Sequence, residues 1–437
     1  MVDLTKTFIK EVKKSADGTK VTIGGWAEHL IHKGKICFLT VRDSTGHIQV
    51  TGIKTKLPEE LWESLLALKN ETIIRLEGLV KKNDKAPGGV EILPEAMQIL
   101  NPVHGPIPID VTGRTPMDDG TVYANRELTI RMPLNKAPFE VKGFIAHATR
   151  EFFIKRGFTE IFTPLMVATA TEGGASLFPI KYFDEDAYLA QSGQFYKQAA
   201  VTAHEKVFGI IPSFRMEKSR TRKHVSEFWQ IEVEAAFYDH IGVMDILDDM
   251  MVYVVNQTIK TAKEPLKALG AKPKKLKGGF PRVTFKDAKE LCTSFELEDK
   301  VDMNEDFTAP EEAALSRHFK TPFFITEWPT HTRGIYYRVN DDDPDISNSF
   351  DLVAPDGFAE LCTGGQRVHE YDKMVAVIKK QGFSLESYEW YLNLFKYGIP
   401  PHAGYGLGLE RLTWWLCGIN NIKQAIMFPR NVDILRP

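Results

Sequence analysis

The sequence contains few cysteines and no long hydrophobic run. Its 437 residues include four cysteines without a Cys-x-x-Cys pair, at Cys37, Cys292, Cys362 and Cys417. This spacing indicates a reducing compartment and gives no sign of a structural zinc site. The first residues, MVDLTKTFIKEVKK, lack the apolar core of a signal peptide, and no run approaches the length of a membrane span. We therefore expect a cytoplasmic protein with no membrane partner.

The chain also lacks a large excess of charge of either sign. It carries 55 Lys and Arg against 58 Asp and Glu, a formal net charge of -3. A polyanion therefore has to be bound by a local basic patch rather than by the surface as a whole. The composition is 43% hydrophobic and 26% charged, which is typical of an ordinary globular protein. The length allows two or three domains.

Residues 1–103 are predicted to form a small closed β-barrel. Residues 20–52 alternate apolar and polar positions, which predicts three short antiparallel strands, with interruptions at Gly24-Gly25, Lys33-Gly34 and Thr45-Gly46. A helical pattern at 58–68 and two further strands, TIIRLEGLVKK and GGVEILPEAMQIL, follow. Five strands with a helix between the third and the fourth are the layout of the OB fold.

Residues 104–135 are predicted to be a linker, and residues 136–437 an α+β domain. Four prolines and three glycines in 101–120 indicate the linker. The next segment, FEVKGFIAHATREFFIKRG, has apolar residues on one helical face and ends at Gly157. Within the domain, residues 264–320 are charged and weakly patterned, which indicates an insertion; its lysine run, KPKKLKGG, is most simply a solvated loop.

The densest basic patch lies in SFRMEKSRTRKHVSEFWQIEVEAAF, residues 213–237, where Arg and Lys fill five of the nine positions 215–223. The flanking runs alternate, which predicts two antiparallel strands joined by a long basic loop. Arg215 and Glu217 would share one face of the first strand, and Glu232 and Glu234 one face of the second. Such a patch suits a polyphosphate, because guanidinium groups bind phosphate oxygens in a bidentate way. The alternative is an exposed hairpin with surface ion pairs.

A second segment favours the phosphate interpretation. PPHAGYGLGLERLTWWLCG, residues 400–418, predicts a glycine-rich loop that leads into a helix beginning near Leu409, with Arg411 in its first turn. Glycines allow backbone to approach a ligand closely, and a helix N-terminus attracts anions.

These segments resemble the signature motifs of class II aminoacyl-tRNA synthetases. FRMEKSRTRKH resembles the second motif, GLGLER the third, and GFTEIFTPLMV the first, whose proline, Pro164 here, lies at the dimer interface. With its N-terminal barrel, the chain resembles the aspartyl/asparaginyl branch. The resemblance implies an α+β protein, with an OB-fold anticodon-binding barrel and a catalytic domain built on an antiparallel sheet flanked by helices. It also implies a homodimer that uses ATP, Mg²⁺ and tRNA, and the lysine run KPKKLKGG is then a second candidate for tRNA contact.

The resemblance further implies roles for individual residues. Arg215, Glu217 and Arg411 would be catalytic. The ATP site as a whole would comprise Arg215, Glu217, Lys223, His224, Phe228, Glu360, Gly408 and Arg411. Glu360 and Thr363, in FAELCTGGQR, would hold Mg²⁺, which prefers oxygen ligands. The alternative for this pair is an ordinary Glu and Thr on a strand.

Two more sites are implied by the resemblance. The amino acid would be bound by Glu172, Gln194, Lys197, Glu232 and Arg367. In the barrel, Phe38 would stack on an anticodon base and Gln49 would hydrogen-bond to a base edge, as OB folds bind single strands. The alternative for Phe38 is a place in the barrel core.

The choice between asparagine and aspartate depends on charge. An aspartate pocket needs positive charge, whereas an asparagine pocket needs an acceptor for the amide NH₂. Lys197 resembles the lysine of aspartyl enzymes, and Glu232 the glutamate of asparaginyl enzymes. We favour asparagine and tRNA(Asn), because Glu232 can accept from the amide and also neutralise Lys197. A Lys197 that points freely into the pocket would favour aspartate, including an enzyme that charges both tRNA(Asp) and tRNA(Asn).

Two other classes of protein fit the sequence less well. A tRNA-independent asparagine synthetase would lack the barrel. A non-catalytic tRNA-binding paralogue would have lost Arg215, Glu360 or Arg411, and all three are present.

Overall fold

The chain divides into two compact units, Met1–Thr115 and Pro116–Pro437. The computed structural model describes residues 5–168, 177–358 and 360–436. The division falls inside the predicted linker, and two short helices that follow it, α3 (Asp119–Ala124) and α4 (Arg126–Thr129), belong to the second unit. The role of 104–135 as a hinge stays a prediction.

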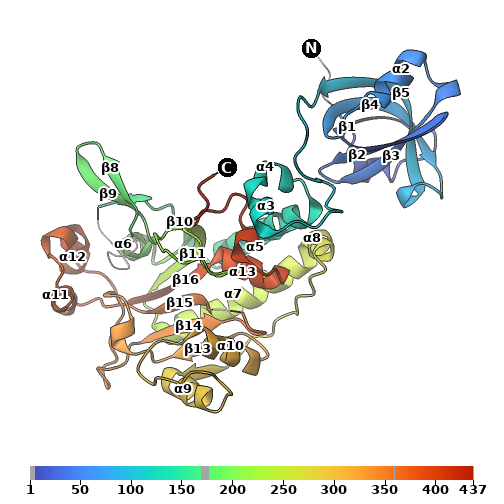
Figure 1. Ribbon diagram of the computed structural model, residues 1–437. Helices are drawn as coiled ribbons and strands as arrows, with labels where there is room; N and C mark the ends of the chain where they lie inside the picture. The colour runs from blue at the N-terminus through green and yellow to red at the C-terminus, as the bar shows by residue number, and fades with distance from the viewer. Residues whose placement is uncertain (1–4, 169–176, 359, 437) are drawn as a thin grey trace. The chain divides into compact units, whose positions relative to one another are not determined.

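The first unit is the predicted five-stranded closed barrel (Figure 1). Its strands lie in the order β1-β2-β3-β5-β4, and helix α2 (Glu59–Leu66) connects β3 to β4. A short helix, α1 (Ile9–Val12), precedes the barrel. The strands are β1 (Lys20–Lys33), β2 (Ile36–Asp43), β3 (Gly46–Ile53), β4 (Thr72–Lys82) and β5 (Val90–Asn101). The OB layout is confirmed.

One predicted turn in the barrel is wrong. Gly24 and Gly25 do not interrupt the chain, since β1 runs through them as a single strand of 14 residues. A Cβ atom at Gly25 would lie 2.2 Å from the main-chain oxygen of Arg42 on β2. The glycine is therefore required by the close approach of two paired strands, not by a turn.

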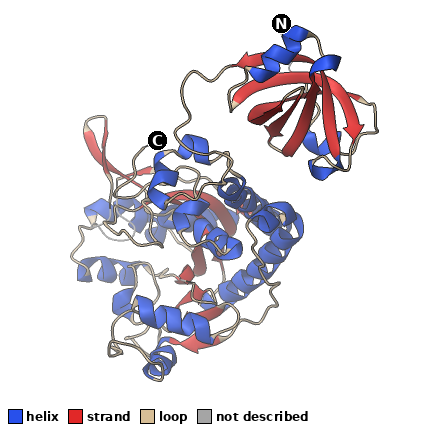
Figure 2. Cartoon of the chain, turned by 45° about the vertical axis from the view of Figure 1, so that its right-hand side comes forward, coloured by secondary structure: helices blue, strands red, loops and turns tan. Residues whose placement is uncertain are grey.

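The second unit is built on an eight-stranded sheet, mostly antiparallel, in the order β12-β13-β14-β15-β16-β11-β10-β6. The long helices α5 (Pro133–Lys155) and α7 (His240–Thr261) pack on one face of it and form the main hydrophobic core (Figure 2). The strands are β6 (Thr159–Glu160), β10 (Lys206–Phe214), β11 (Glu227–Ala236), β12 (Arg282–Thr284), β13 (Phe323–Thr326), β14 (Ser349–Val353), β15 (Glu360–Gln366) and β16 (His402–Gly408). The predicted α+β class is confirmed.

Helix α5 begins earlier than the sequence pattern indicates. Pro133 occupies its first turn, where a missing N–H costs nothing, and the predicted apolar face from Ile145 to Phe153 is buried. Gly157, with a φ of 74°, follows the helix as expected.

Strands β10 and β11 form the predicted antiparallel hairpin, in register from Lys206–Ala235 to Phe214–Glu227. Strand β10 ends at Phe214, however, so Arg215 and Glu217 do not share a strand face but lie in the basic loop. The Arg215 N–H still donates to the Ser226 carbonyl (2.9 Å), which closes the base of this loop.

The glycine-rich segment before Leu409 is a strand rather than a loop. Strand β16 pairs with both β11 and β15, and helix α13 (Leu409–Cys417) follows it directly. A Cβ atom at Gly404 would lie 2.2 Å from a carboxylate oxygen of Glu234. Glycine is needed here because buried charged side chains of β11 occupy the space above the strand.

Residues 264–320 are part of the domain and not a detached loop. Strand β12 forms one edge of the sheet, and helices α8 (Lys263–Ala268), α9 (Phe285–Thr293) and α10 (Ala309–His318) lie around it in the chain. Phe285 and Leu315 are buried with Phe323 and Trp328 in a core of their own. Whether the segment is an insertion stays a prediction.

The remaining elements lie around the sheet. A separate small sheet contains β7 (Met166–Val167), β8 (Pro179–Tyr182) and β9 (Glu185–Leu189), and three more helices are α6 (Gln194–His204), α11 (Tyr371–Lys380) and α12 (Glu389–Lys396). All four cysteines are buried and unpaired. No helix within the described ranges is long and apolar enough to cross a membrane.

Candidate active site

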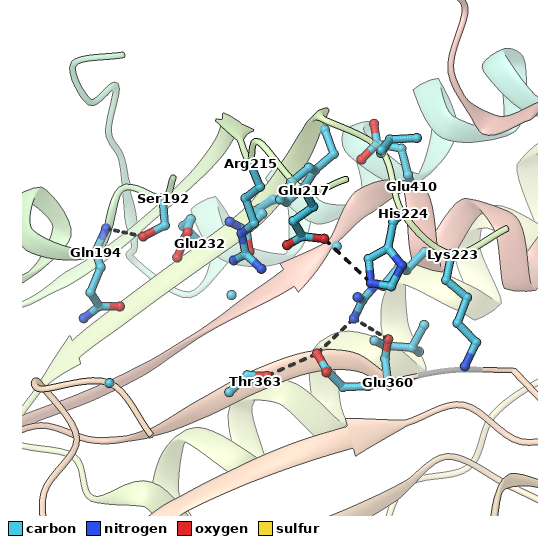
Figure 3. A pocket seen from close by; sticks show the side chains of 18 of the residues that line it. Ser192, Gln194, Arg215, Glu217, Lys223, His224, Glu232, Glu360, Thr363 and Glu410 are labelled. Atoms are coloured by element: carbon cyan, nitrogen blue, oxygen red, sulfur yellow. Dashed lines mark hydrogen bonds and ion pairs between the residues drawn. The ribbon is translucent and has the colours of Figure 1, made fainter. Parts of the chain in front are cut away.

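A cavity of about 260 Å³ lies in the second unit, on strands β11, β15 and β16 and beneath the basic loop (Figure 3). Most of the predicted site residues line it: Gln194, Arg215, Glu217, Lys223, His224, Phe228, Glu232, Glu360, Thr363, Arg367, Gly408 and Arg411. Lys197 is buried beside it, and Glu172 lies outside the described residues. Segments far apart in the sequence thus converge on one cavity.

One end of the cavity is rich in cations. The guanidinium of Arg215 lies 5.3 Å from the Phe228 ring, and its buried Nε has no hydrogen-bond partner among the described residues. Arg411 Nη1 donates to the main-chain oxygen of Glu360 (2.9 Å) and to its carboxylate (3.0 Å). These groups can receive phosphate oxygens.

His224 lies among the same cations. Burial lowers the pKa of His224, and Arg411 and Lys223 lower it further, against the opposite effect of Glu217. The imidazole is therefore neutral near pH 7. Its Nε2 lies 3.8 Å from a Glu217 carboxylate oxygen (Figure 3).

Oxygen donors lie at the start of β15. Thr363 Oγ1 donates to Glu360 Oε1 (3.1 Å), and Asp351 on β14 is paired with Thr363 across the strands. Burial alone would raise the pKa of Glu360, but Arg411 and Arg333 outweigh it and lower that pKa. An ionised carboxylate with a hydroxyl three residues away fits a hard cation such as Mg²⁺. The described residues hold no group of three or more His, Cys, Asp or Glu side chains arranged for a metal.

The other end of the cavity is a buried charge cluster. Arg367 donates through Nε to Glu234 Oε1 (2.9 Å) and through Nη2 to Oε2 (3.3 Å). Lys197 Nζ lies 2.6 Å from Glu232 Oε2, 3.3 Å from Glu234 Oε2 and 3.0 Å from the Tyr405 main-chain oxygen. All four charged side chains are at most 3% exposed, and their formal charges cancel.

The pairing with Arg367 and Lys197 keeps the Glu234 carboxylate ionised. Burial alone would raise the pKa of Glu234, but Arg367 and Lys197 outweigh it and lower that pKa. Arg367 Nη1 is buried and has no hydrogen-bond partner among the described residues. Because Arg367 also lines the cavity, this nitrogen is placed where it can donate to a ligand oxygen.

A chain of hydrogen bonds fixes the amide of Gln194. Its Nε2 donates to Gln198 Oε1 (3.0 Å), and Gln198 Nε2 donates to His402 Nε2 (2.8 Å). His402 Nδ1 can then donate to the Pro400 carbonyl (2.8 Å), which sets the tautomer. Burial lowers the pKa of His402 to about 4, so the ring is neutral. The Gln194 carbonyl oxygen is left to accept from a cationic ligand group.

Several site residues were not found from the sequence. Arg333 lines the cavity and pairs with Asp351 (2.9 Å), and Glu410 lines it while accepting from the Trp229 main-chain N–H (2.8 Å). Glu234 was recognised as a strand residue but not as the partner of Arg367. For Glu234 the sequence signal was charge on a strand that is otherwise apolar. Arg333 lies in a bend and Glu410 in the first turn of helix α13, where a charged residue gives no such signal.

The predicted anticodon pair lies on one face of the barrel. Phe38 and Thr40 alternate with the core residues Cys37 and Leu39, and Gln49 is paired with Thr40 on the next strand. Phe38 is thus half-buried on the outer face and not part of the core.

The predicted interface proline lies in an apolar surface segment. Pro164 is exposed, and large apolar side chains around it are exposed as well: Phe162 (86%), Leu165 (37%) and Met166 (56%). Several large exposed apolar side chains within one short segment are typical of a surface that another protein covers.

Comparison with known proteins agrees with this geometry. Residues 118–432 match the family described as tRNA synthetases class II (D, K and N), and residues 21–100 match the OB-fold nucleic acid binding domain. The chain is 38% identical to the aspartate--tRNA(Asp/Asn) ligase of Methanopyrus kandleri and also 38% identical to the asparagine--tRNA ligase of Pyrococcus abyssi; each match covers 99% of this chain and all of the relative.

The solved structures agree as well. The asparaginyl-tRNA synthetase of Pyrococcus horikoshii, complexed with asparaginyl-adenylate, superposes with a TM-score of 0.93 at 36% identity, over 99% of this chain and 100% of that one. These matches define the protein as an aminoacyl-tRNA ligase. The chain belongs to the class II aminoacyl-tRNA synthetases, in the aspartyl/asparaginyl group.

Proposed function

We propose that the protein is an asparagine--tRNA ligase, which activates asparagine with ATP and transfers it to tRNA(Asn). The observation that carries this choice is the pairing of Lys197. An ammonium group has three N–H donors, and three protein oxygens lie within 3.3 Å of it. Two of these oxygens, on Glu232 and Tyr405, accept hydrogen bonds from Lys197, and Glu234 pairs with it by charge, so the ammonium group is held by protein oxygens rather than directed at a substrate carboxylate. Glu232 lines the cavity and has a second oxygen for an amide NH₂.

The charge of the cluster supports the same substrate. Lys197, Arg367, Glu232 and Glu234 together carry no net charge, so a neutral side chain adds no uncompensated charge to a buried site. Arg367 Nη1 would donate to the side-chain oxygen of asparagine, and the Gln194 carbonyl would accept from its α-ammonium group.

The chemistry takes two steps. An oxygen of the asparagine carboxylate attacks the α-phosphorus of ATP, and pyrophosphate leaves; a hydroxyl of the terminal tRNA ribose then attacks the acyl carbon, and AMP leaves. Arg215, with its unpartnered Nε, would bind the α-phosphate, while Phe228 would stack on the adenine and Arg411 would bind its other side or the outer phosphates. Fixed cations of this kind act by stabilising charge that develops on phosphate oxygens.

Mg²⁺ would be held by Glu360 and Thr363. When bound it would neutralise charge on the phosphate oxygens. The Glu360 carboxylate accepts hydrogen bonds from Arg411 and from the Thr363 hydroxyl, and Thr363 is paired with Asp351 across the strands. Both oxygen donors are therefore in place before ATP arrives.

Two further partners, the tRNA anticodon and a second subunit, would bind to residues on the surface of the protein. Phe38 and Gln49 would read the anticodon, and the apolar segment around Pro164 would form a homodimer interface. A cytoplasmic location agrees with the reduced, buried cysteines.

A second candidate is an aspartate--tRNA ligase that charges tRNA(Asp) and tRNA(Asn). Several relatives favour it, since they are aspartate--tRNA(Asp/Asn) ligases; that of Methanospirillum hungatei is 40% identical over 95% of this chain. Its pocket would have to release Lys197 from Glu232.

ATP–pyrophosphate exchange with each amino acid separately tests the proposal. We expect exchange with asparagine and little with aspartate. Exchange with aspartate alone would establish the second candidate, and a folded protein that exchanges with neither would contradict the proposed site.

A further inference from the structure

Helix α10 reaches the cation-rich end of the cavity, although it lies in the segment 264–320, for which the sequence suggested only tRNA contact by the lysine run. Glu312, in its first turn, uses both carboxylate oxygens. Oε1 accepts from the main-chain N–H of Glu360 (2.7 Å), and Oε2 lies 2.6 Å from Lys223 Nζ. One side chain thus joins the start of strand β15 to the basic loop.

The same face of α10 holds the turn that leads into β15. Ser316, one helical turn after Glu312, accepts through its carbonyl from the Asp356 N–H (2.9 Å) and through its hydroxyl from the Gly357 N–H (3.0 Å). That hydroxyl also donates to the Ala354 carbonyl. Positions four apart lie on one side of a helix, so Glu312 and Ser316 form one support for this turn.

The helix itself is firmly anchored. Thr308 and Glu311 form a capping box at its start. Glu311 also pairs with Lys289 at 3.1 Å, and both side chains are at most 4% exposed. Glu312 is therefore presented from a fixed backbone rather than from a mobile loop.

We propose that Glu312 is a positioning residue of the ATP site, a proposal that rests on the assignment of Glu360 and Lys223 to that site. Through Oε1 it fixes the start of β15 and hence the Glu360 carboxylate. Through Oε2 it holds Lys223 near the start of β15 until a triphosphate replaces the Glu312 carboxylate as the partner of the Lys223 ammonium group. The two oxygens therefore have separable roles.

Two variants separate these roles. Glu312→Gln keeps a carbonyl oxygen for the Glu360 N–H but removes the charge that holds Lys223. Glu312→Ala removes both contacts. Glu298→Gln is the matched control, because it removes one charge from an exposed carboxylate of the same segment. An ordinary partly exposed ion pair would give small and equal effects for both Glu312 variants.

The first readout is independent of activity. Hydrogen exchange of the peptide that contains the Glu360 amide is measured on the full-length protein without ligands. We expect Glu312→Ala to speed exchange of this peptide at least tenfold, and Glu312→Gln to stay within about threefold of the unchanged protein. Near-ultraviolet circular dichroism checks that each variant is folded.

The second readout is ATP–pyrophosphate exchange at varied Mg²⁺ and ATP. For Glu312→Ala we expect the Mg²⁺ concentration at half-maximal rate to rise about tenfold, with the KM for asparagine unchanged. For Glu312→Gln we expect an unchanged Mg²⁺ requirement and a KM for ATP that is equal or lower, because Lys223 is released. The control should behave like the unchanged protein in all assays.

Three results would overturn the inference: Glu312→Ala behaving like the unchanged protein, Glu312→Gln as impaired as Glu312→Ala, or equal effects of the Glu298 control. These outcomes test the role of Glu312 alone, provided that the unchanged protein catalyses ATP–pyrophosphate exchange. Absence of exchange in the unchanged protein would instead contradict the proposed function.

Discussion

Replacement of Glu232 by Gln is expected to weaken the preference for asparagine over aspartate. The carboxylate lies 2.6 Å from Lys197 and lines the cavity. Its removal leaves the buried cluster with one net positive charge, which favours a substrate carboxylate. At an effective dielectric constant near 20, unit charges about 4 Å apart interact by about 4 kcal/mol. Asparagine at the same time loses an acceptor for its amide, which typically costs about 1–3 kcal/mol.

A shift well below the sum of these two effects would already be measurable. A combined shift of about 2 kcal/mol changes the ratio of kcat/KM for asparagine to kcat/KM for aspartate about thirtyfold. The assay is ATP–pyrophosphate exchange with each amino acid, and Glu227→Gln, at the start of the same strand, is the charge-matched control. A folded Glu232→Gln protein whose ratio stays within threefold of the original would refute the argument from charge.

Four further predictions concern other parts of the chain. Arg215→Ala should lower kcat of exchange by about 10²–10³-fold, the usual effect of losing a fixed donor to transition-state charge; a loss below fivefold would exclude contact with the α-phosphate. Phe38→Ala should lower kcat/KM for tRNA charging about tenfold or more, as one stacked base contributes about 1–3 kcal/mol, and equal losses in charging and exchange would contradict a role in anticodon binding. Phe162→Asp should give monomers in light scattering, since the side chain is 86% exposed in the single chain; an unchanged particle mass would place any interface elsewhere. The pKa of His402 is about 4 in the folded protein and about 6.5 in the unfolded chain, so the unfolded state binds more protons between these pH values. The free energy of unfolding should therefore fall by up to roughly 3 kcal/mol as the pH falls from 6.5 to 4. Urea unfolding of His402→Gln should lack this part of the pH dependence.

The barrel and the basic hairpin could be predicted because their strands carry a local signal. Alternating apolar residues such as Ile231 and Val233 specify both the strand and its buried face. The same reasoning failed for β16, whose glycines have low intrinsic preference for strands. Pairing with β11 and β15 makes this segment a strand, and the bulk of Glu234 excludes larger residues from position 404.

The charge cluster could be predicted only in part, since its partners are distant in sequence. The sequence indicated Lys197, Glu232 and Arg367 as charged residues of the amino-acid site. Their pairing, however, depends on how α6, β11, β15 and β16 meet in the fold. The sequence allowed Lys197 to be free or paired, with opposite consequences for the substrate. Glu312 had no local signal at all, because its role is defined by main-chain and side-chain groups from two other segments.

The most direct test of the proposed substrate is a crystal structure with a non-hydrolysable asparaginyl-adenylate analogue. We predict the side-chain oxygen on Arg367 Nη1, the amide nitrogen within hydrogen-bond distance of Glu232, and Lys197 still paired with Glu232 and Glu234. A Lys197 ammonium that has left both carboxylates to contact the ligand would contradict the account.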